Sequence, residues 1–486
     1  MLFVSLAIRA ALVVLVLRWP RLALYALMAC AIVFEIFPLT FSDSFTDDFG
    51  FFLNLNNSAG LPISASPADL TVIVALLGWL RARAGDHSLR PDGPLLKAYV
   101  LFGVALAIAE VHGLLSQGDF NVTLWELRPQ IYGFATFVVA SSLIRDRRHL
   151  VILASIFLAA ASVKVGVGYN RYFNTLHSDL GTAEAILAHE DSYFLSMVIV
   201  ALVAALIWFR RRMVVLALLV LAPFAGLVML ENHRRVGILA LGAALAIITI
   251  LGVRFESRIR YRIAAVALVA GLAYAGLLVA FWNAEYGVAA QLVRPVHSLF
   301  QPDERDYNSN LYRQNEDANL VATYQQSPLI GVGFGLPMQV VFPLADISQQ
   351  YPFWQFIPHN TIFWIGMRMG LLGMMTFWGM LGIALLQGIR VLRDETMPLV
   401  KASVAFALAG VIAELIVGFG DLQLENYRNL IFFGCMLGVI NAGHRIRETV
   451  HAKRPAWAAV PTIPGVPMGG GWKPSYTPLT PSTPAG

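Results

Sequence analysis

Apolar residues are grouped along the chain into runs of roughly twenty, the length that spans a bilayer as an α-helix. Short polar or basic connections separate these runs, which fall near residues 2–17, 22–40, 67–80, 98–115, 129–143, 150–168, 193–209, 213–230, 236–253, 263–282, 361–389, 399–418 and 426–443. The pattern predicts an all-α polytopic membrane protein with roughly 12–13 transmembrane helices.

The composition agrees with a membrane protein. Hydrophobic residues make up 57% of the chain and charged residues 13%, whereas soluble proteins carry about 25% charged residues. Arg9 interrupts the first run and a second run follows at once, which favours a retained helix over a cleaved signal peptide. Cys30 and Cys435 both lie in apolar runs, so a disulfide framework or a cysteine-based metal site is excluded. The net charge of +5 fits anchoring residues and does not indicate a nucleic-acid partner.

Clusters of Lys and Arg occur at alternate connections, which predicts that these connections are cytoplasmic. The amino terminus then lies outside and the carboxyl terminus inside. The expected organisation is an N-terminal transmembrane bundle (1–282), a large outside loop (283–358), C-terminal transmembrane helices (359–443) and a cytoplasmic tail (444–486). From Ala452 the tail is rich in Pro, Gly, Ser and Thr, a composition typical of disorder.

The outside loop has roughly 75 residues, and loops beyond about 15 residues without structure are uncommon. Within it, Asn315–Gln326 is predicted to be helical, and the glycine-rich stretch Ser327–Gly335 is predicted to form a tight turn. We therefore expect a folded loop that covers a site.

His359-Asn360, followed by Gly370 and Gly373, stands where this loop meets the next apolar run. On a continuous helix the offset from His359 to Gly370 is about three turns, so the imidazole and the glycines are expected along one stripe. Glycines let a neighbouring backbone approach closely. The stripe predicts a histidine held in a fixed place at the membrane boundary, suited to act as a general base. A structural role for a single histidine is the alternative.

Several arginines fall on the predicted outer side, where the positive-inside rule predicts few. They are Arg128, Arg171, Arg234, Arg235, Arg294, Arg305, Arg313 and Arg428. A charge facing hydrocarbon is unfavourable by about 2.5–3.5 kcal/mol near the membrane centre, so those beside apolar runs are expected to face a shared polar cavity. Because a guanidinium binds phosphate in bidentate fashion, such a ring suits a lipid pyrophosphate.

Some of these arginines have simpler interpretations. An interfacial arginine is often a snorkelling anchor. Arg294 and Arg305 are interpreted as solvated charges of the loop, and Glu425 is close enough in sequence to pair with Arg428.

Arg234 and Arg235 begin an apolar run, where the helix dipole disfavours cations, so they need a compensating anion. Glu231 is the nearest candidate in the sequence. In the same way, Glu126 is interpreted as a partner of Arg128.

Other polar clusters carry weaker signals. His189-Glu190-Asp191 precedes a span, where it orients an acceptor or caps the helix; capping is favoured. Gly331–Gly335 lacks a following Lys-Ser/Thr and is therefore not a nucleotide P-loop. No set of metal-ligating residues stands out in the outside loops, so no metal and no cofactor are predicted.

The motifs together resemble the O-antigen ligase family of bacterial membrane glycosyltransferases. That family carries His-Asn or a similar pair, nine residues, and then Gly-x-x-Gly, which matches His359-Asn360, Gly370 and Gly373. Its large loop carries an arginine, a helix and a turn similar to Pro-Leu-Leu-Gly-Val-Gly.

In this chain the loop features correspond to Arg313, Asn315–Gln326 and Pro328–Gly333. A short arginine motif of the family resembles the stretch 234–237, with Arg235 matching its arginine. The resemblance covers the order of spans from about residue 67 to residue 443, with specific motifs in 231–237 and 313–373 only.

The chain departs from the family pattern at two positions. Arg234 replaces a small polar residue, and Arg368 stands where the family often has an acidic residue. By helical phase Arg368 is expected to point away from His359. These differences affect the expected acceptor more than the reaction class.

The resemblance implies a fold of the type C glycosyltransferase kind and metal-independent transfer of a glycan from undecaprenyl pyrophosphate to an acceptor hydroxyl. It implies that His359 is the catalytic base and that Arg235 and Arg313 bind pyrophosphate, with Arg128 and Arg428 as weaker candidates. The expected supporting residues are Arg234, Asn360, Gly370, Gly373, Glu190 and Asp191.

The favoured function is O-antigen ligation onto lipid A-core at the periplasmic side of the bacterial inner membrane. The expected partners are the lipid-linked glycan, an acceptor glycan, lipid A-core or protein hydroxyl, and membrane lipids. A polysaccharide polymerase and a protein O-oligosaccharyltransferase fit the same motifs. A lipid-linked sugar transporter or flippase fits less well, because transporters place broken helices and charges near mid-membrane, and a scaffold would not need the histidine and arginine set.

Overall fold

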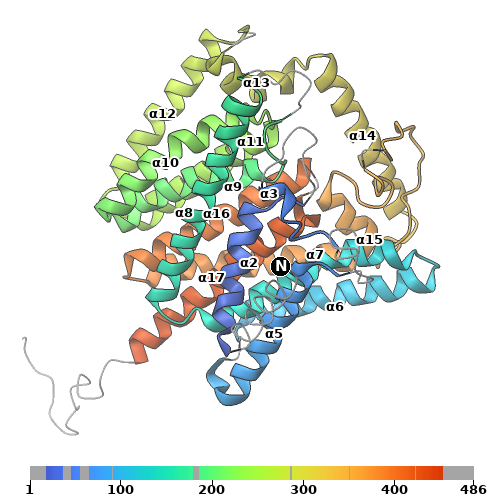
Figure 1. Cartoon of the computed structure of the whole chain (residues 1–486), viewed down its shortest axis with the longest axis horizontal. Coiled ribbons are helices and arrows are strands. Elements are labelled where there is room, and N and C mark those ends of the chain that lie inside the picture. Colours follow the sequence, from blue (N-terminus) through green and yellow to red (C-terminus); the bar gives the residue numbers. More distant parts are fainter. Residues whose placement is uncertain are drawn as a thin grey trace, which may run out of the picture. The chain divides into compact units, whose positions relative to one another are not determined.

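The computed structural model describes residues 18–36, 45–54, 65–89, 91–178, 185–284, 287–349, 351–421 and 423–452. The predicted run 2–17 and the tail from residue 453 lie outside these ranges. The elements within them are helices, without a strand among the described residues, so the all-α prediction is confirmed (Figure 1).

Each predicted apolar run that the structure describes coincides with a helix. The helices are α2 (Pro20–Val33), α5 (Pro67–Gly85), α6 (Pro94–Leu115), α7 (Phe120–Leu143), α8 (Arg147–Asn170), α9 (Asp191–Ala204), α10 (Arg212–Glu231), α11 (Arg235–Phe255), α12 (Arg260–Ala280), α15 (Thr361–Asp394), α16 (Pro398–Gly420) and α17 (Tyr427–Ala452). Among the described residues, 8 helices are long and apolar enough to cross a membrane, namely α6, α8 to α12, α15 and α16. The chain is therefore a multi-pass membrane protein.

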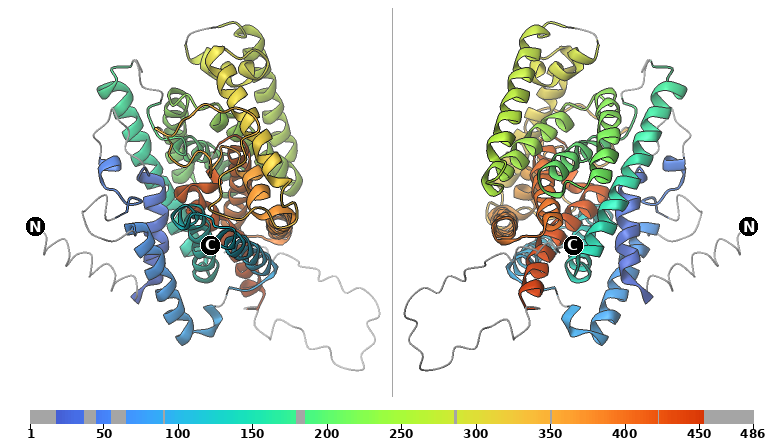
Figure 2. Two further views of the ribbon diagram at one scale, coloured as in Figure 1. Left: turned by 90° about the vertical axis from the view of Figure 1, so that its right-hand side faces the viewer. Right: turned by 90° about the vertical axis from the view of Figure 1, so that its left-hand side faces the viewer.

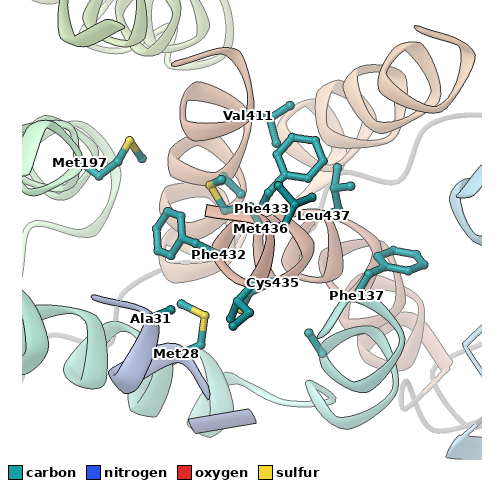
Figure 3. Close-up of a cluster of buried hydrophobic side chains, with 14 of the residues drawn as sticks. Met28, Ala31, Phe137, Met197, Val411, Phe432, Phe433, Cys435, Met436 and Leu437 are labelled. Carbon is teal, nitrogen blue, oxygen red and sulfur yellow. The ribbon is translucent and has the colours of Figure 1, made fainter. Parts of the chain in front are cut away.

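Helix α17 lies in the core of the bundle. Its side chains Phe432, Phe433, Cys435, Met436 and Leu437 meet Met28 and Ala31 of α2, Phe137 of α7, Met197 of α9 and Val411 of α16 (Figure 3). A Cβ atom added at Gly434 would overlap the backbone of Gly133 on α7. This glycine pair lets α7 and α17 approach backbone to backbone.

The large loop is folded, as its length predicted. It contains α13 (Val288–Phe300) and α14 (Glu304–Tyr324), and α14 begins earlier than the predicted start at Asn315. The Asp303 side chain caps α14 by accepting a hydrogen bond from the Asp306 backbone N–H at 2.7 Å. Helix α14 packs against α15, and Figure 2 shows the two side by side, in gold and orange.

Helix α15 is interrupted at Gly370, which adopts φ 61° and ψ −156°. The turn that follows α14 fills the break: the N–H groups of Leu371 and Leu372 donate to the carbonyls of Pro328 and Leu329 at 2.8 and 3.0 Å. A Cβ atom at Gly370 would lie 2.5 Å from the backbone of this turn. The positive φ and the close approach both require glycine here.

The predicted stripe on one continuous helix is therefore wrong. His359 precedes the first helical residue, Thr361, and Gly370 breaks the helix between the histidine and Gly373. Another backbone does approach Gly370 closely, as predicted, but it belongs to the loop turn and not to a neighbouring helix. Gly373 faces the side chain of Met369 in its own helix.

A buried ion pair fixes the same turn from the other side. Arg368 Nε donates to Glu126 Oε1 at 2.6 Å, and Glu126 Oε2 accepts from the Gly335 backbone at 2.7 Å. Arg368 also donates to the carbonyls of Gly333, Leu336 and Phe356. The Arg368 guanidinium is thus occupied by these partners, and Glu126 pairs with Arg368 instead of the predicted Arg128.

Candidate functional site

His359 is held by a buried carboxylate. Its Nδ1 lies 3.1 Å from each carboxylate oxygen of Glu316 on α14, and its backbone N–H donates to Glu316 Oε2 at 2.9 Å. The Glu316 side chain is only 1% exposed. The ring of Tyr312 meets the imidazole edge to face, with 5.7 Å between centroids. These contacts fix the imidazole and leave Nε2 as the nitrogen available for chemistry.

The charge balance around His359 favours its protonated form. Burial lowers the pKa of the imidazole, but the hydrogen bond and charge of Glu316, together with Asp421, outweigh burial and raise it above its usual range. Burial raises the pKa of the neighbouring Asp317 carboxyl to about 6, against the lowering effect of Asn360 and Arg313. The two groups are thus shifted in the same direction, each to a higher pKa.

A polar cavity of about 160 Å³ is lined by residues of α11, α13 and α14. His359 is not one of its lining residues, but Asp421, which lines the cavity, interacts electrostatically with the imidazole. Its lining includes five arginines, two histidines and two aspartates: Arg234, Arg235, Arg294, Arg305, Arg313, His189, His233, Asp306 and Asp421. The structure thus brings Arg235 and Arg313 into one cavity. It also brings in Arg294 and Arg305, which the sequence had left as solvated loop charges.

Arg235 is the first residue of α11, and Arg234 occupies the N-cap position, as the apolar run predicted. The compensating anion of Arg235 is Asp306 at 3.2 Å, with Ser298 Oγ accepting at 3.1 Å. Glu231, the predicted anion, instead accepts a hydrogen bond from a glutamine of α13. Sequence could not identify Asp306, because it lies in the loop far from α11.

Arg313 links the cavity to the histidine. It lies on α14, three residues before Glu316, so the two side chains are neighbours on the helix surface. Within the described part of the chain Arg313 makes no ion pair, whereas Arg294 pairs with Asp303 at 2.8 Å and is 47% exposed. Arg313 therefore lines the cavity without a direct ion pair in the described residues, although its charge acts on the nearby carboxyls of Asp317 and Asp421.

The cavity lining also contains a second histidine–carboxylate pair. His189 Nδ1 lies 3.0 Å from Asp421 Oδ2. Burial raises the pKa of Asp421, but His189, His359 and Arg313 outweigh it and hold the carboxyl well below its usual range. Neither Glu316 nor Asp421 was predicted as a site residue from the sequence. The three-residue spacing of Arg313 and Glu316 on a predicted helix could have indicated that Glu316 lies near the site. Asp421 follows a different span, and no sequence pattern connects it with the site.

Arg428 lies in a separate, fully buried network. Its Nε donates to the carbonyl of Ala31 at 2.7 Å, and it contacts the carboxylates of Asp191 and Glu190. Its anions are therefore these two residues and not the predicted Glu425. Glu190 occupies the N-cap position of α9 without a side-chain capping bond. The favoured capping role of this acidic pair is therefore wrong.

The same network continues through the bundle. Lys164 of α8 contacts Asp191 at 3.0 Å and Glu35 at 2.6 Å, and Arg171 contacts Glu35 at 2.8 Å. These side chains are at most 1% exposed. Neither Arg171 nor Arg428 is among the cavity-lining residues.

Arg128 also lies away from the cavity. It approaches Asp69 at 3.5 Å, donates to Asn54 at 3.0 Å and covers the ring of Trp125 at 5.8 Å. Asn360 caps α15 by accepting a hydrogen bond from the Phe363 N–H at 3.2 Å. The predicted four-arginine pocket thus contains Arg235 and Arg313 but not the two weaker candidates.

Residues 223–378 match the model of a family described as O-antigen ligase. The matched segment includes Arg235, Arg313, Glu316 and His359. No curated protein matches the chain.

Proposed function

Since residues 223–378 match the O-antigen ligase family, we propose that the protein transfers a glycan from undecaprenyl pyrophosphate to an acceptor hydroxyl at the periplasmic face of the bacterial inner membrane. Lipid A-core is the acceptor we favour. The proposal is carried by a carboxylate-held histidine that is coupled, through Arg313 and Asp421, to an arginine-lined cavity.

His359 acts as the general base in this reaction. Because Nδ1 is bound to Glu316, the proton of the acceptor hydroxyl goes to Nε2. The negative charge of Glu316 stabilises the imidazolium that forms, in the way that a buried carboxylate supports a catalytic histidine. The acceptor oxygen then forms the new bond to the anomeric carbon.

The leaving group departs into the cationic cavity. As the bond between the anomeric carbon and the phosphate oxygen breaks, the electron pair leaves with the lipid pyrophosphate. Arg313 is available to bind this developing charge, and Arg235 stands on the facing helix α11. Fixed guanidinium groups in a site of low dielectric supply the electrostatic stabilisation that a metal supplies in other transferases.

The test measures transfer by the full-length protein in lipid nanodiscs, from a purified polyprenyl-pyrophosphate glycan, with EDTA present. His359→Ala should leave the protein folded and reduce transfer by at least about a hundredfold, the scale of a lost general base. His87→Ala, an exposed histidine outside the site, is the matched control. Wild-type turnover by His359→Ala would overturn the base. Activity that vanishes with EDTA and returns with Mg²⁺ would overturn metal independence.

The acceptor is tested by offering lipid A-core, a second lipid-linked glycan or an acceptor protein in the same assay. Transfer to lipid A-core alone supports the ligase. Chain elongation of the lipid-linked glycan would instead identify a polymerase, and glycosylation of a serine or threonine hydroxyl would identify a protein O-oligosaccharyltransferase. Translocation of the lipid-linked glycan without transfer would favour a flippase.

A further inference from the structure

We propose that the helix bundle binds one anionic phospholipid, with an acyl chain in an apolar cavity between α8, α10, α16 and α17 and the lipid phosphate on Arg211. The inference goes beyond the proposed function and does not depend on glycan transfer. Three observations support it: the cavity itself, a basic turn without carboxylate partners at its rim, and a distorted backbone that joins the two.

This apolar cavity lies at the end of the bundle away from the cationic cavity. Helix α9 begins at Asp191, two residues after His189 of the cationic cavity, and α10 ends at Glu231, shortly before Arg235. The turn that joins α9 to α10 is therefore at the far end of both helices. The basic connections at this end are those predicted to be cytoplasmic.

The cavity has a volume of about 200 Å³, and its lining is almost wholly apolar. Its inner wall includes Phe432, Cys435 and Met436 of α17, which are all buried (Figure 3), and Phe406 of α16 lines another side. Such a space does not hold water, because a water molecule would find no hydrogen-bond partners there. In a bilayer, a lipid hydrocarbon chain can fill it and regain the packing contacts that an empty space forfeits.

The cavity opens between α8 and α10. Ala154 and Ser155 of α8 line it and are exposed on the surface of the bundle, as is Arg211 at the start of α10. Val151, which is also part of the lining, is 38% exposed. A lipid chain can therefore reach the cavity sideways from the bilayer, with its headgroup at Arg211.

Arg211 is the charged residue of this lining, and it belongs to a run of three arginines, Arg210 to Arg212. Arg211 is the N-cap of α10 and Arg212 its first residue, so both stand at the positive end of the helix dipole. Within the residues that the structure describes, neither forms an ion pair with a carboxylate. At the other end of the bundle, Arg235 begins α11 in the same way but is compensated by Asp306 at 3.2 Å. A phosphate would supply the anion that Arg211 lacks.

The backbone between α9 and α10 is distorted beside the cavity. Helix α9 continues into the π-helical turn η3 (Ala205–Phe209), and the Arg210 N–H donates to the Ala205 carbonyl at 2.7 Å. Arg210 then adopts φ 46° and ψ 20°, a left-handed conformation that is uncommon for residues other than glycine. Ala205 and Phe209 line the cavity, and Arg210 Nε donates to the Leu206 carbonyl at 3.2 Å. Such distortions concentrate at functional sites, and this one places Arg211 at the rim.

A fixed cation beside an apolar cavity selects an anionic phospholipid. A soluble phosphate would leave the cavity empty, and the headgroup of a zwitterionic lipid carries its own cation, which competes with Arg211 for the phosphate. In an anionic phosphodiester lipid the net negative charge and the start of the acyl chain are a few bonds apart. The donor lipid fits less well, because its pyrophosphate is proposed to bind at the other end of the bundle.

The experiment measures lipid binding to the full-length protein by native mass spectrometry, with phosphatidylglycerol and phosphatidylethanolamine of identical chains. Wild type should bind one phosphatidylglycerol in preference to phosphatidylethanolamine. Arg211→Gln should weaken phosphatidylglycerol binding by about fivefold, the contribution of one arginine near an anionic lipid surface, and should leave phosphatidylethanolamine binding nearly unchanged. Arg258→Gln, at an exposed position between α11 and α12 at the same end of the bundle, is the matched control and should bind as wild type does.

Ala154→Phe tests the cavity separately from the charge. The added ring occupies the rim, so binding of both lipids should fall, whereas Ala159→Phe, at an exposed position of α8 outside the lining, should bind as wild type does. Both substitutions are at exposed positions, so the bundle should still fold.

Equal affinity of wild type for the two lipids, or undiminished phosphatidylglycerol binding by Arg211→Gln, would overturn the phosphate contact. Unchanged binding by Ala154→Phe would overturn the cavity as the site. Displacement of phosphatidylglycerol by undecaprenyl phosphate would assign the cavity to a polyprenyl chain and would also overturn the inference. Glycan transfer is not measured in this experiment, so none of these outcomes bears on the proposed function.

Discussion

Two sets of arginines occur in this protein, and they are held in opposite ways. Arg171 and Arg428 are fully buried, and each contacts carboxylates that are themselves buried. Arg235 and Arg313 line an open cavity in which guanidinium groups outnumber carboxylates. From sequence, both sets are outer-side arginines near apolar runs, and only their partners separate them.

The comparison shows how charge balance separates structure from function. A buried arginine that meets carboxylates has its charge neutralised, and it joins helices together. An arginine that faces a cavity with few anions contributes a positive electrostatic potential, which attracts an anionic ligand. The first kind should be required for folding, and the second kind should be required for turnover.

The largest expected effect comes from breaking the buried network. Arg428→Ala leaves Asp191 without its closest guanidinium partner, and removing one member of a buried pair costs about 3–5 kcal/mol. The purified variant should show a clearly lower thermal unfolding midpoint or fail to fold. Arg294→Ala, at a half-exposed position, is the control and should unfold as wild type does. An Arg428→Ala protein of wild-type stability would remove the distinction between the two sets.

Arg235→Ala and Arg313→Ala should give the reverse result. Both variants should fold, because the two side chains line a cavity, and each should reduce glycan transfer by about a hundredfold, the scale of a lost oxyanion ligand. Lysine at either position keeps the charge but loses the bidentate fork, so its rescue should be incomplete. Undiminished transfer in both alanine variants would contradict the pocket.

A smaller effect is expected from Glu316→Gln, and it concerns pH. The base must be neutral to accept a proton, so the acid limb of wild-type activity should lie above the usual pKa of histidine, because Glu316 outweighs burial. Glutamine removes the charge while burial remains, so the pKa of His359 falls and the acid limb moves to lower pH. Transfer should also drop by about tenfold, since the imidazolium loses its carboxylate. Glu316→Asp should restore the wild-type limb in part. An unmoved pH profile would mean that another group sets it.

No effect on transfer is expected from truncation after Ala452. The composition beyond that residue is rich in Pro, Gly, Ser and Thr and is not suited to forming a core. The test compares glycan transfer and the thermal unfolding midpoint of the truncated protein with those of the full chain at equal expression. A loss of activity without a loss of expression would indicate a docking role for the tail.

The sequence predicted the parts of the fold that depend on local pattern. Apolar runs located the helices, and glycine content located the turn at Ser327–Gly335. The break at Gly370 was missed, because its motif looks the same whether glycine permits a helix contact or replaces a helical residue. The amino-acid sequence alone does not show whether a given glycine adopts a positive φ.

The candidate site was predicted in its residue types but not in its pairings. His359, Arg235 and Arg313 were selected from the chain, and the structure places the two arginines in one cavity. The carboxylates that pair with His359 and Arg235, namely Glu316 and Asp306, were not predicted. Asp421 meets His189 across 232 positions of the chain, and such contacts follow from packing between spans.

The packing of the turn at Ser327–Gly335 against its neighbours also determines where residues can be inserted or deleted. Gly331 and Gly333 bring their backbones against α15 and α6 so closely that a Cβ atom at either would overlap main-chain atoms. An added or lost residue between Glu316 and Gly331 is therefore expected to move the Glu316 carboxylate away from His359. The segment from the turn to the histidine is anchored too, because Arg368 donates to the carbonyls of Leu336 and Phe356, and the backbone N–H groups of Val341 and Phe342 donate to Asn319 on α14. Insertions should therefore be tolerated between Phe342 and Phe356, where the loop runs from one anchor to the next.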